Sequence, residues 1–167
     1  MTQAWSDDEE LLSLAIDTNL LLLLVVGLAS KRLIKDRKHK RLQQYGADDY
    51  DKLAEVAGKV RDIIVTPSVL TEVCNLAPHG IHEPLRSRIL LIIAQLVRGF
   101  NENLIRCLNE KYTPSRDVVT DDNFLKLGLT DCAWLLTMDT KTILLTDDKD
   151  LYNAAMARGL KAARFSI

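Results

Sequence analysis

The sequence has little of what marks several large classes of protein. Aromatic residues make up only 5% of the 167 residues, so aliphatic side chains must fill the core. The net charge is −1, which excludes a global positive field for nucleic acid and leaves only local patches. The cysteines Cys74, Cys107 and Cys132 are far apart and form no CxxC pair. We therefore expect buried, reduced thiols in a cytoplasmic protein.

The longest apolar run is too short to cross a membrane. Residues 20–29 are all apolar, whereas a spanning helix needs about 20 such residues. The acidic residues at 6–10 stand where a secretory signal would carry basic ones. With 167 residues, of which 47% are hydrophobic and 27% charged, the chain is expected to form one globular domain that has no membrane contact.

Segments with the length and composition of strands alternate with helical ones. We expect strands at 11–16, 62–67, 142–146 and 160–166. We expect helices at 20–30, 50–60, 67–76, 130–140 and 148–159, loops at 77–80 and 111–123, and a long helical region at 84–111 that Gly99 could break. This alternation predicts an α/β fold with a central, mostly parallel sheet covered by helices on both faces.

Four acidic residues fall at or near the carboxyl ends of the expected strands. Asp17 directly follows the first strand, and Glu72 lies in the second turn of the helix after the second strand. Asp131 and Asp148 begin later helices, the former behind Thr130 as the expected cap. Ligands of parallel sheets bind at this edge, so the acids are expected to meet there. Crowded carboxylates need a divalent cation, and oxygen ligands favour Mg²⁺ or Mn²⁺ over zinc. Each acid alone could equally be a helix cap.

Four short segments resemble, in order, the acidic motifs of the PIN-domain family. They are IDTNLLL at 16–22, TPSVLTEV at 66–73, LTDCAWL at 129–135 and LLTDDKDL at 144–151. The chain is most similar to VapC-type toxin ribonucleases, over most of its length from Leu11 to Ser166. The resemblance implies a three-layer PIN-like fold over one domain, residues 1–167, with a basic insertion at about 31–49.

The resemblance also implies a function. It indicates a metal-dependent endoribonuclease that cleaves RNA with water and is commonly paired, as a toxin, with an antitoxin protein. The implied catalytic and metal-binding residues are Asp17, Glu72, Asp131 and Asp148, with Asp150 as a further metal ligand and Asn19 and Thr146 in support. The adjacent Asp147 leaves the fourth ligand uncertain by one residue, and its position in the motif favours Asp148.

A basic segment at 31–41 has a local charge of 7 − 1 = +6, with His39 uncounted. Its basic residues are Lys31, Arg32, Lys35, Arg37, Lys38, Lys40 and Arg41. They could bind RNA phosphates beside the acids or simply form a solvated face. Because the segment has no aromatic residue, we expect contacts to the RNA backbone rather than to its bases.

Several alternatives remain open from the sequence. The apolar segment 88–97 could be core, or an interface with an antitoxin or a second copy. His79 and His82 are spaced like metal ligands but lack a third partner nearby. A haloacid-dehalogenase-like phosphatase would need a second aspartate where this chain has Asn19. The non-enzymatic alternative is a catalytically silent PIN-like module that binds RNA or protein.

Overall fold

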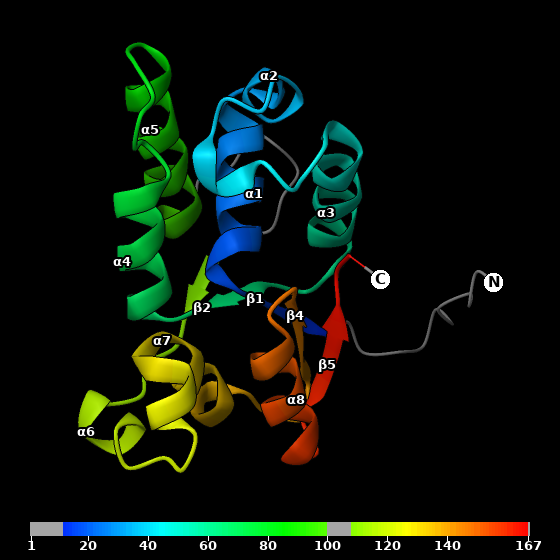
Figure 1. Ribbon diagram of the computed structural model, residues 1–167, viewed down its shortest axis with the longest axis vertical. Coiled ribbons are helices and arrows are strands. Elements are labelled where there is room, and N and C mark those ends of the chain that lie inside the picture. Colours follow the sequence, from blue (N-terminus) through cyan, green and yellow to red (C-terminus); the bar gives the residue numbers. More distant parts are fainter. Residues whose placement is uncertain (1–11, 100–107, 167) are drawn as a thin grey trace, which may run out of the picture.

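The structure is a computed structural model that describes residues 12–99 and 108–166. Five parallel strands form one sheet in the order β3-β2-β1-β4-β5 (Figure 1). Their bounds are Ser13–Ile16 for β1, Ile63–Val65 for β2, Leu108–Glu110 for β3, Thr142–Thr146 for β4 and Lys161–Arg164 for β5. The expected α/β fold with a parallel sheet is therefore confirmed.

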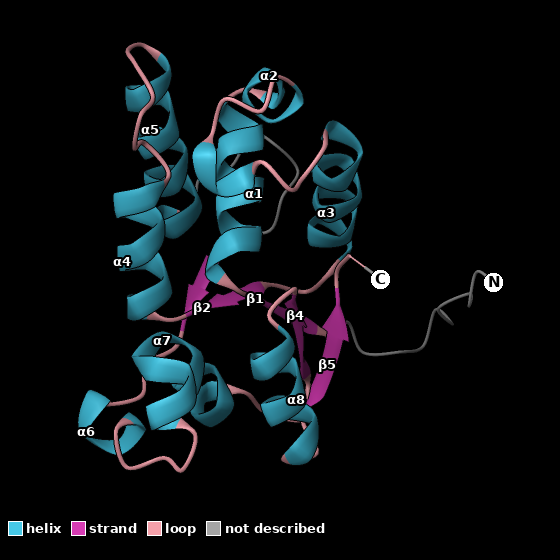
Figure 2. Ribbon diagram, viewed as in Figure 1, coloured by secondary structure: helices cyan, strands magenta, loops and turns pink. Residues whose placement is uncertain are grey.

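Helices cover both faces of the sheet and complete three layers (Figure 2). One layer holds α1 (Thr18–Ala29), α2 (Lys31–Lys35), α3 (Ala47–Lys59), α4 (Pro67–Leu76), α5 (Leu85–Arg98) and the short 3₁₀ helix η1 (Lys40–Leu42). The other layer holds α6 (Ser115–Val118), α7 (Phe124–Thr137) and α8 (Lys149–Ala157). The helices that precede β3 thus lie on one face of the sheet, and those that follow it lie on the other.

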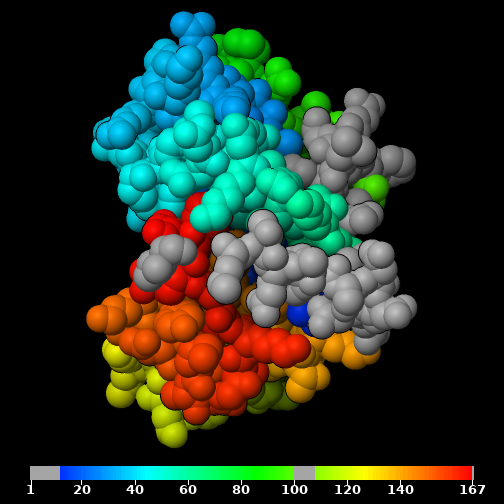
Figure 3. Space-filling model, turned by 90° about the vertical axis from the view of Figure 1, so that its right-hand side faces the viewer, coloured from blue at the N-terminus to red at the C-terminus, as the bar shows by residue number. Residues whose placement is uncertain are grey.

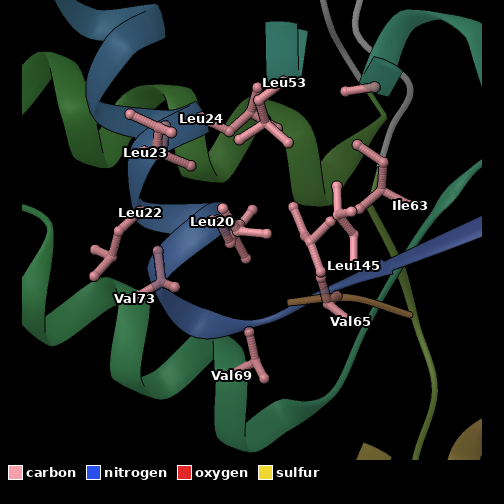
Figure 4. Packing of buried hydrophobic residues seen from close by; sticks show 14 of the residues in the cluster. Leu20, Leu22, Leu23, Leu24, Leu53, Ile63, Val65, Val69, Val73 and Leu145 are labelled. Atoms are coloured by element: carbon pink, nitrogen blue, oxygen red, sulfur yellow. The ribbon is translucent and has the colours of Figure 1, made fainter. Parts of the chain in front are cut away.

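The apolar run after Asp17 is the central helix α1. It contacts α2, α3, α4, α5 and η1, so its side chains meet protein on every side. Residues 20–26 are all fully buried, and leucines of α1 pack against Leu53, Val69 and Val73 of neighbouring helices (Figure 4). Burial of each such side chain stabilises the fold by about 1.5–3 kcal/mol. No helix in the described ranges is both long and apolar enough to cross a membrane.

Residues 108–110 correct one sequence-based prediction. The expected helical region at 84–111 ends at Arg98, where Gly99 adopts a left-handed conformation with φ 81°. Leu108–Glu110 then pairs with β2 as the edge strand β3. Asn and Glu have low strand propensity, so this pairing depends on the neighbouring strand rather than on local sequence. The short helix α6 likewise forms within the expected loop at 111–123.

The cysteine prediction is only partly right. Cys132 is buried, as expected, whereas Cys74 is exposed on α4. Positions on the outer face of an amphipathic helix stay accessible whatever their hydrophobicity, and Cys74 occupies such a position beside buried Val73. Cys107 lies outside the described residues.

The segment 31–49 is folded onto the domain rather than looped out. Its own side chains Leu33, Ile34 and Leu42 are buried. Its histidine, His39, is also buried, and its Nε2 donates to the carbonyl oxygens of Leu76 and Ala77, each at 3.2 Å. These carbonyls end α4, so His39 joins η1 to the carboxyl end of that helix.

Gly27 permits the close approach of α3 to α1. A Cβ atom at this position would lie 2.1 Å from Cδ2 of Tyr50. We expect Gly27→Ala to lower the free energy of unfolding by about 1–3 kcal/mol, because overpacking outweighs the gain in helix propensity. Chemical denaturation measures this change. In a Tyr50→Ala background the same substitution should be much less damaging, whereas equal effects in both backgrounds would contradict the packing argument.

Candidate functional site

The sheet order places the carboxyl ends of β1 and β4 side by side. From β1 the chain passes to β2 through helices on one face, and from β4 it passes to β5 through α8 on the other. The two strands therefore mark the point at which the winding of the sheet reverses. Parallel sheets bind ligands in the crevice that such a reversal opens.

Asp17 stands directly after β1 and caps α1. Its Oδ1 accepts a hydrogen bond of 2.9 Å from the backbone N–H of Leu20. Its Oδ2 accepts one from the hydroxyl of Thr146 and one of 3.2 Å from the backbone N–H of Asp147. These bonds allow the carboxyl to be only 6% exposed between two apolar segments. Burial raises the pKa of Asp17, and the hydrogen bonds offset part of that rise.

Glu72 joins three helices at the same edge of the sheet. The hydroxyl of Thr18 on α1 donates to Oε2 at 2.7 Å, and the hydroxyl of Thr130 on α7 donates to Oε1 at 2.8 Å. Thr130 thus orients Glu72, whereas the sequence had suggested a helix cap. The two threonines were missed as site residues, and their only sequence signal is that each adjoins a motif aspartate.

A break in α7 sets the position of Asp131. Gly128 has φ 77° and ψ −175°, a conformation that is essentially restricted to glycine, so the helix starts afresh just before Thr130. Asp131 is half-buried, and no described residue donates a hydrogen bond to it. Burial, together with the negative charges of Asp148, Asp17 and Glu72, raises the pKa of Asp131 to about 7. The structure therefore brings the other three predicted acids within electrostatic reach of Asp131.

Asp148 caps α8 and leaves one oxygen open. Its Oδ1 accepts from the backbone N–H groups of Asp150 at 2.7 Å and Leu151 at 2.9 Å. No hydrogen bond within the described ranges engages its Oδ2. The carboxylate therefore combines a fixed orientation with free lone pairs near Asp131.

The carboxylate of Asp147 is held by groups outside the four acids, although its charge still helps to raise the pKa of Asp17. Its carboxylate accepts hydrogen bonds from the hydroxyl of Tyr45 at 2.8 Å and from the backbone N–H and hydroxyl of Ser166 at 2.8 and 2.7 Å. Burial would raise the pKa of Asp147, but these bonds and the charge of Arg164 lower it overall. Of the adjacent pair, the geometry favours Asp148 as the acid that faces the site.

Two other predicted site residues are placed differently from the four acids. The exposed carboxylate of Asp150 pairs with Nζ of Lys126 at 2.9 Å. Asn19 is exposed and makes no hydrogen bond to Asp17 among the described residues. Thr146, the other expected supporting residue, does bind Asp17.

The donor set has the chemistry of a hard-cation site. An ionised carboxylate offers about four lone pairs, and Asp17 uses three of them while Glu72 uses two. The remaining lone pairs, with those of Asp131 and Asp148, are oxygen donors that suit Mg²⁺ or Mn²⁺. Across residues 12–99 and 108–166, however, no three His, Cys, Asp or Glu side chains already converge as a metal-binding group.

The basic segment starts at the far end of α1 from Asp17. It begins after Ser30, at the end of α1 opposite Asp17, and a 12-residue helix is about 18 Å long (Figure 1). Lys31 pairs with Asp51, and Arg32 pairs with Asp36 at 3.2 Å. The remaining basic residues, Lys35, Arg37, Lys38, Lys40 and Arg41, are exposed. The start of the segment is thus separated from Asp17 by the length of α1, whereas Tyr45, four residues after Arg41, reaches Asp147 with its hydroxyl.

A scan against protein-family models and a search of curated proteins found no match to this chain. The fold and site by themselves define an α/β protein with a parallel sheet and a group of carboxylates where its winding reverses. What this group does is inferred below from its chemistry.

Proposed function

We propose that the chain is a metal-dependent endoribonuclease of the PIN type. The observation that carries this proposal is the grouping of Asp17, Glu72 and Asp148 around Asp131, whose pKa is raised to about 7 by burial and by the charges of the other three. Such repulsion lowers the stability of the metal-free fold, and a bound divalent cation would remove it. When bound, Mg²⁺ or Mn²⁺ would supply charge neutralisation at the phosphate and a more acidic attacking water.

The four acids differ in how firmly they are held. Asp17 is fixed by three hydrogen bonds, and Glu72 by the hydroxyls of Thr18 and Thr130. Asp131 lacks a donor in the described structure and holds a proton below about pH 7. Cation affinity should therefore decline as the pH falls below 7, because a ligand must lose its proton to bind.

Cleavage of labelled single-stranded RNA tests the proposal. We expect cleavage with Mg²⁺ or Mn²⁺, none with EDTA, and loss of cleavage in Glu72→Gln, which removes the charge but keeps an acceptor for Thr18 or Thr130. Asp122→Asn, an exposed acid outside the site, is the matched control and should cleave normally. Cleavage that persists in EDTA, or in Glu72→Gln, would show that the proposed chemistry is wrong.

A non-enzymatic function is the second candidate, supported by an exposed apolar surface. Helix α5 buries Ile89, Ile93 and other residues in the core, so the segment 88–97 is partly core. Its outer face exposes Leu90, Leu91 and Val97 by 39%, 58% and 44%. An antitoxin or a second copy of the chain could cover this face. A silent module of this kind should show no rise in melting temperature with Mn²⁺, whereas the enzyme should.

A further inference from the structure

A pocket of about 420 Å³ lies on the side of the molecule formed by α8 and β5. It is lined by Lys149, Tyr152 and Asn153 of α8 and by Arg164 of β5. The three helical residues are spaced i, i+3 and i+4, so they share one face of α8. Figure 3 shows this side of the molecule, with the orange and red atoms of α8 and β5 below α3. The hollow is shallow and open to solvent rather than enclosed.

The lining carries two positive charges and no acid. Within the described ranges, neither Lys149 nor Arg164 forms an ion pair at 4 Å or less. The Nε of Arg164 is buried and has no hydrogen-bond partner in the described structure.

Two of the neighbouring acids are engaged with other groups. Asp147 accepts from Tyr45 and Ser166, and Asp150 pairs with Lys126. The charge of Arg164 also acts on Asp147 and helps to lower its pKa, whereas Lys149 has no ion pair in the described structure and is the cation left to an outside anion. Phosphate oxygens suit both, because guanidinium and ammonium groups form strong charge-assisted hydrogen bonds with them.

The pocket is close, along the chain and across the sheet, to two residues of the site. Lys149 directly follows Asp148, and Arg164 lies opposite Thr146 in the ladder between β4 and β5. Thr146 in turn binds Asp17. This proximity is the reason to relate the pocket to the bond that is cleaved.

We propose that the pocket binds one nucleotide of a single-stranded RNA next to the bond that is cleaved, an inference that rests on the proposed function. Lys149 and Arg164 hold its phosphate, the ring of Tyr152 stacks on its base, and the side-chain amide of Asn153 hydrogen-bonds the edge of that base. Stacking on an aromatic ring tolerates every base, and the amide adds selectivity.

Fluorescence anisotropy with a labelled single-stranded RNA, in EDTA so that binding is separated from cleavage, tests the inference. Tyr152→Leu should weaken binding by about 5- to 150-fold, while Tyr152→Phe should bind normally. Lys149→Gln should weaken binding and lower the slope of log affinity against log salt by about 0.7. Because Arg164 is half-buried, Lys149→Gln is the decisive charge variant. Lys161→Gln, an exposed lysine of β5 outside the lining, is the matched control.

The outcomes separate the pocket from the proposed function. Equal affinities for Lys149→Gln and Lys161→Gln, or no RNA binding by the unmodified chain, would overturn the pocket inference. If the pocket bound adenosine monophosphate more tightly than RNA, the proposal that its ligand is a nucleotide within single-stranded RNA would be overturned. Binding that depends on Lys149 and Tyr152 without cleavage in Mg²⁺ or Mn²⁺ would support the pocket and overturn the nuclease proposal. Cleavage in Mg²⁺ or Mn²⁺ that is unaffected by the pocket variants would support the nuclease proposal and overturn the pocket inference.

Discussion

Asp131→Asn is expected to make the metal-free protein more stable at pH 8, by about 2 kcal/mol. In the folded chain the pKa of Asp131 is raised from 3.8 to about 7, by burial and by the charges of Asp148, Asp17 and Glu72. The native state thus binds this proton more tightly than the unfolded chain does. The stabilisation that this bound proton gives the native state is complete below about pH 4 and is lost as the pH rises through 7. Asparagine carries no charge, so the variant avoids this loss.

Urea unfolding in EDTA at several pH values between 4 and 8 measures this effect. The gain in the free energy of unfolding should grow with pH across this range. Asp122→Asn, at an exposed position outside the site, should show no such trend. Mn²⁺ should stabilise the unmodified chain more than Asp131→Asn, because the cation removes the repulsion that the variant already lacks. A gain that does not vary with pH would show that repulsion among these acids is not its cause.

Asp148→Asn is expected to reduce RNA cleavage by at least about 100-fold, whereas Asp147→Asn should retain most of the activity. Even outer partners of metal ligands contribute 10- to 100-fold, so loss of a ligand should exceed that. Asparagine caps helices as well as aspartate, so α8 should stay intact in Asp148→Asn. The comparison tests the assignment of Asp148 as the acid that faces the site.

Asp147→Asn should show its effect in stability. The side chain accepts hydrogen bonds from Tyr45 and Ser166, and an amide nitrogen would face one of these donors. We expect the free energy of unfolding to fall by about 1–3 kcal/mol. Parallel measurement of cleavage rates and of urea unfolding separates the two variants. If Asp147→Asn lost activity and Asp148→Asn kept it, the assignment would be reversed.

Local sequence predicted the elements whose hydrophobic pattern and caps agree with their structure. The strand at 142–146 and the helix opened by Pro67 have the predicted bounds. Edge strand β3 could not be predicted, because Asn109 and Glu110 become strand only through hydrogen bonds to β2. The distance between the basic segment and the acids also depended on the length and direction of α1 within the fold.

The sequence by itself determined that Asp17 stands at the joint between a buried strand and a buried helix. Apolar residues on both sides bury the flanking strand and helix, which places the carboxyl at the end of the sheet. Only the tertiary structure decided which neighbours Asp17 meets and that Asp148, rather than Asp147, acts on Asp131. Those choices depend on donors distant in sequence, such as Tyr45 and Thr146, because a buried carboxylate is stable only where such donors satisfy it.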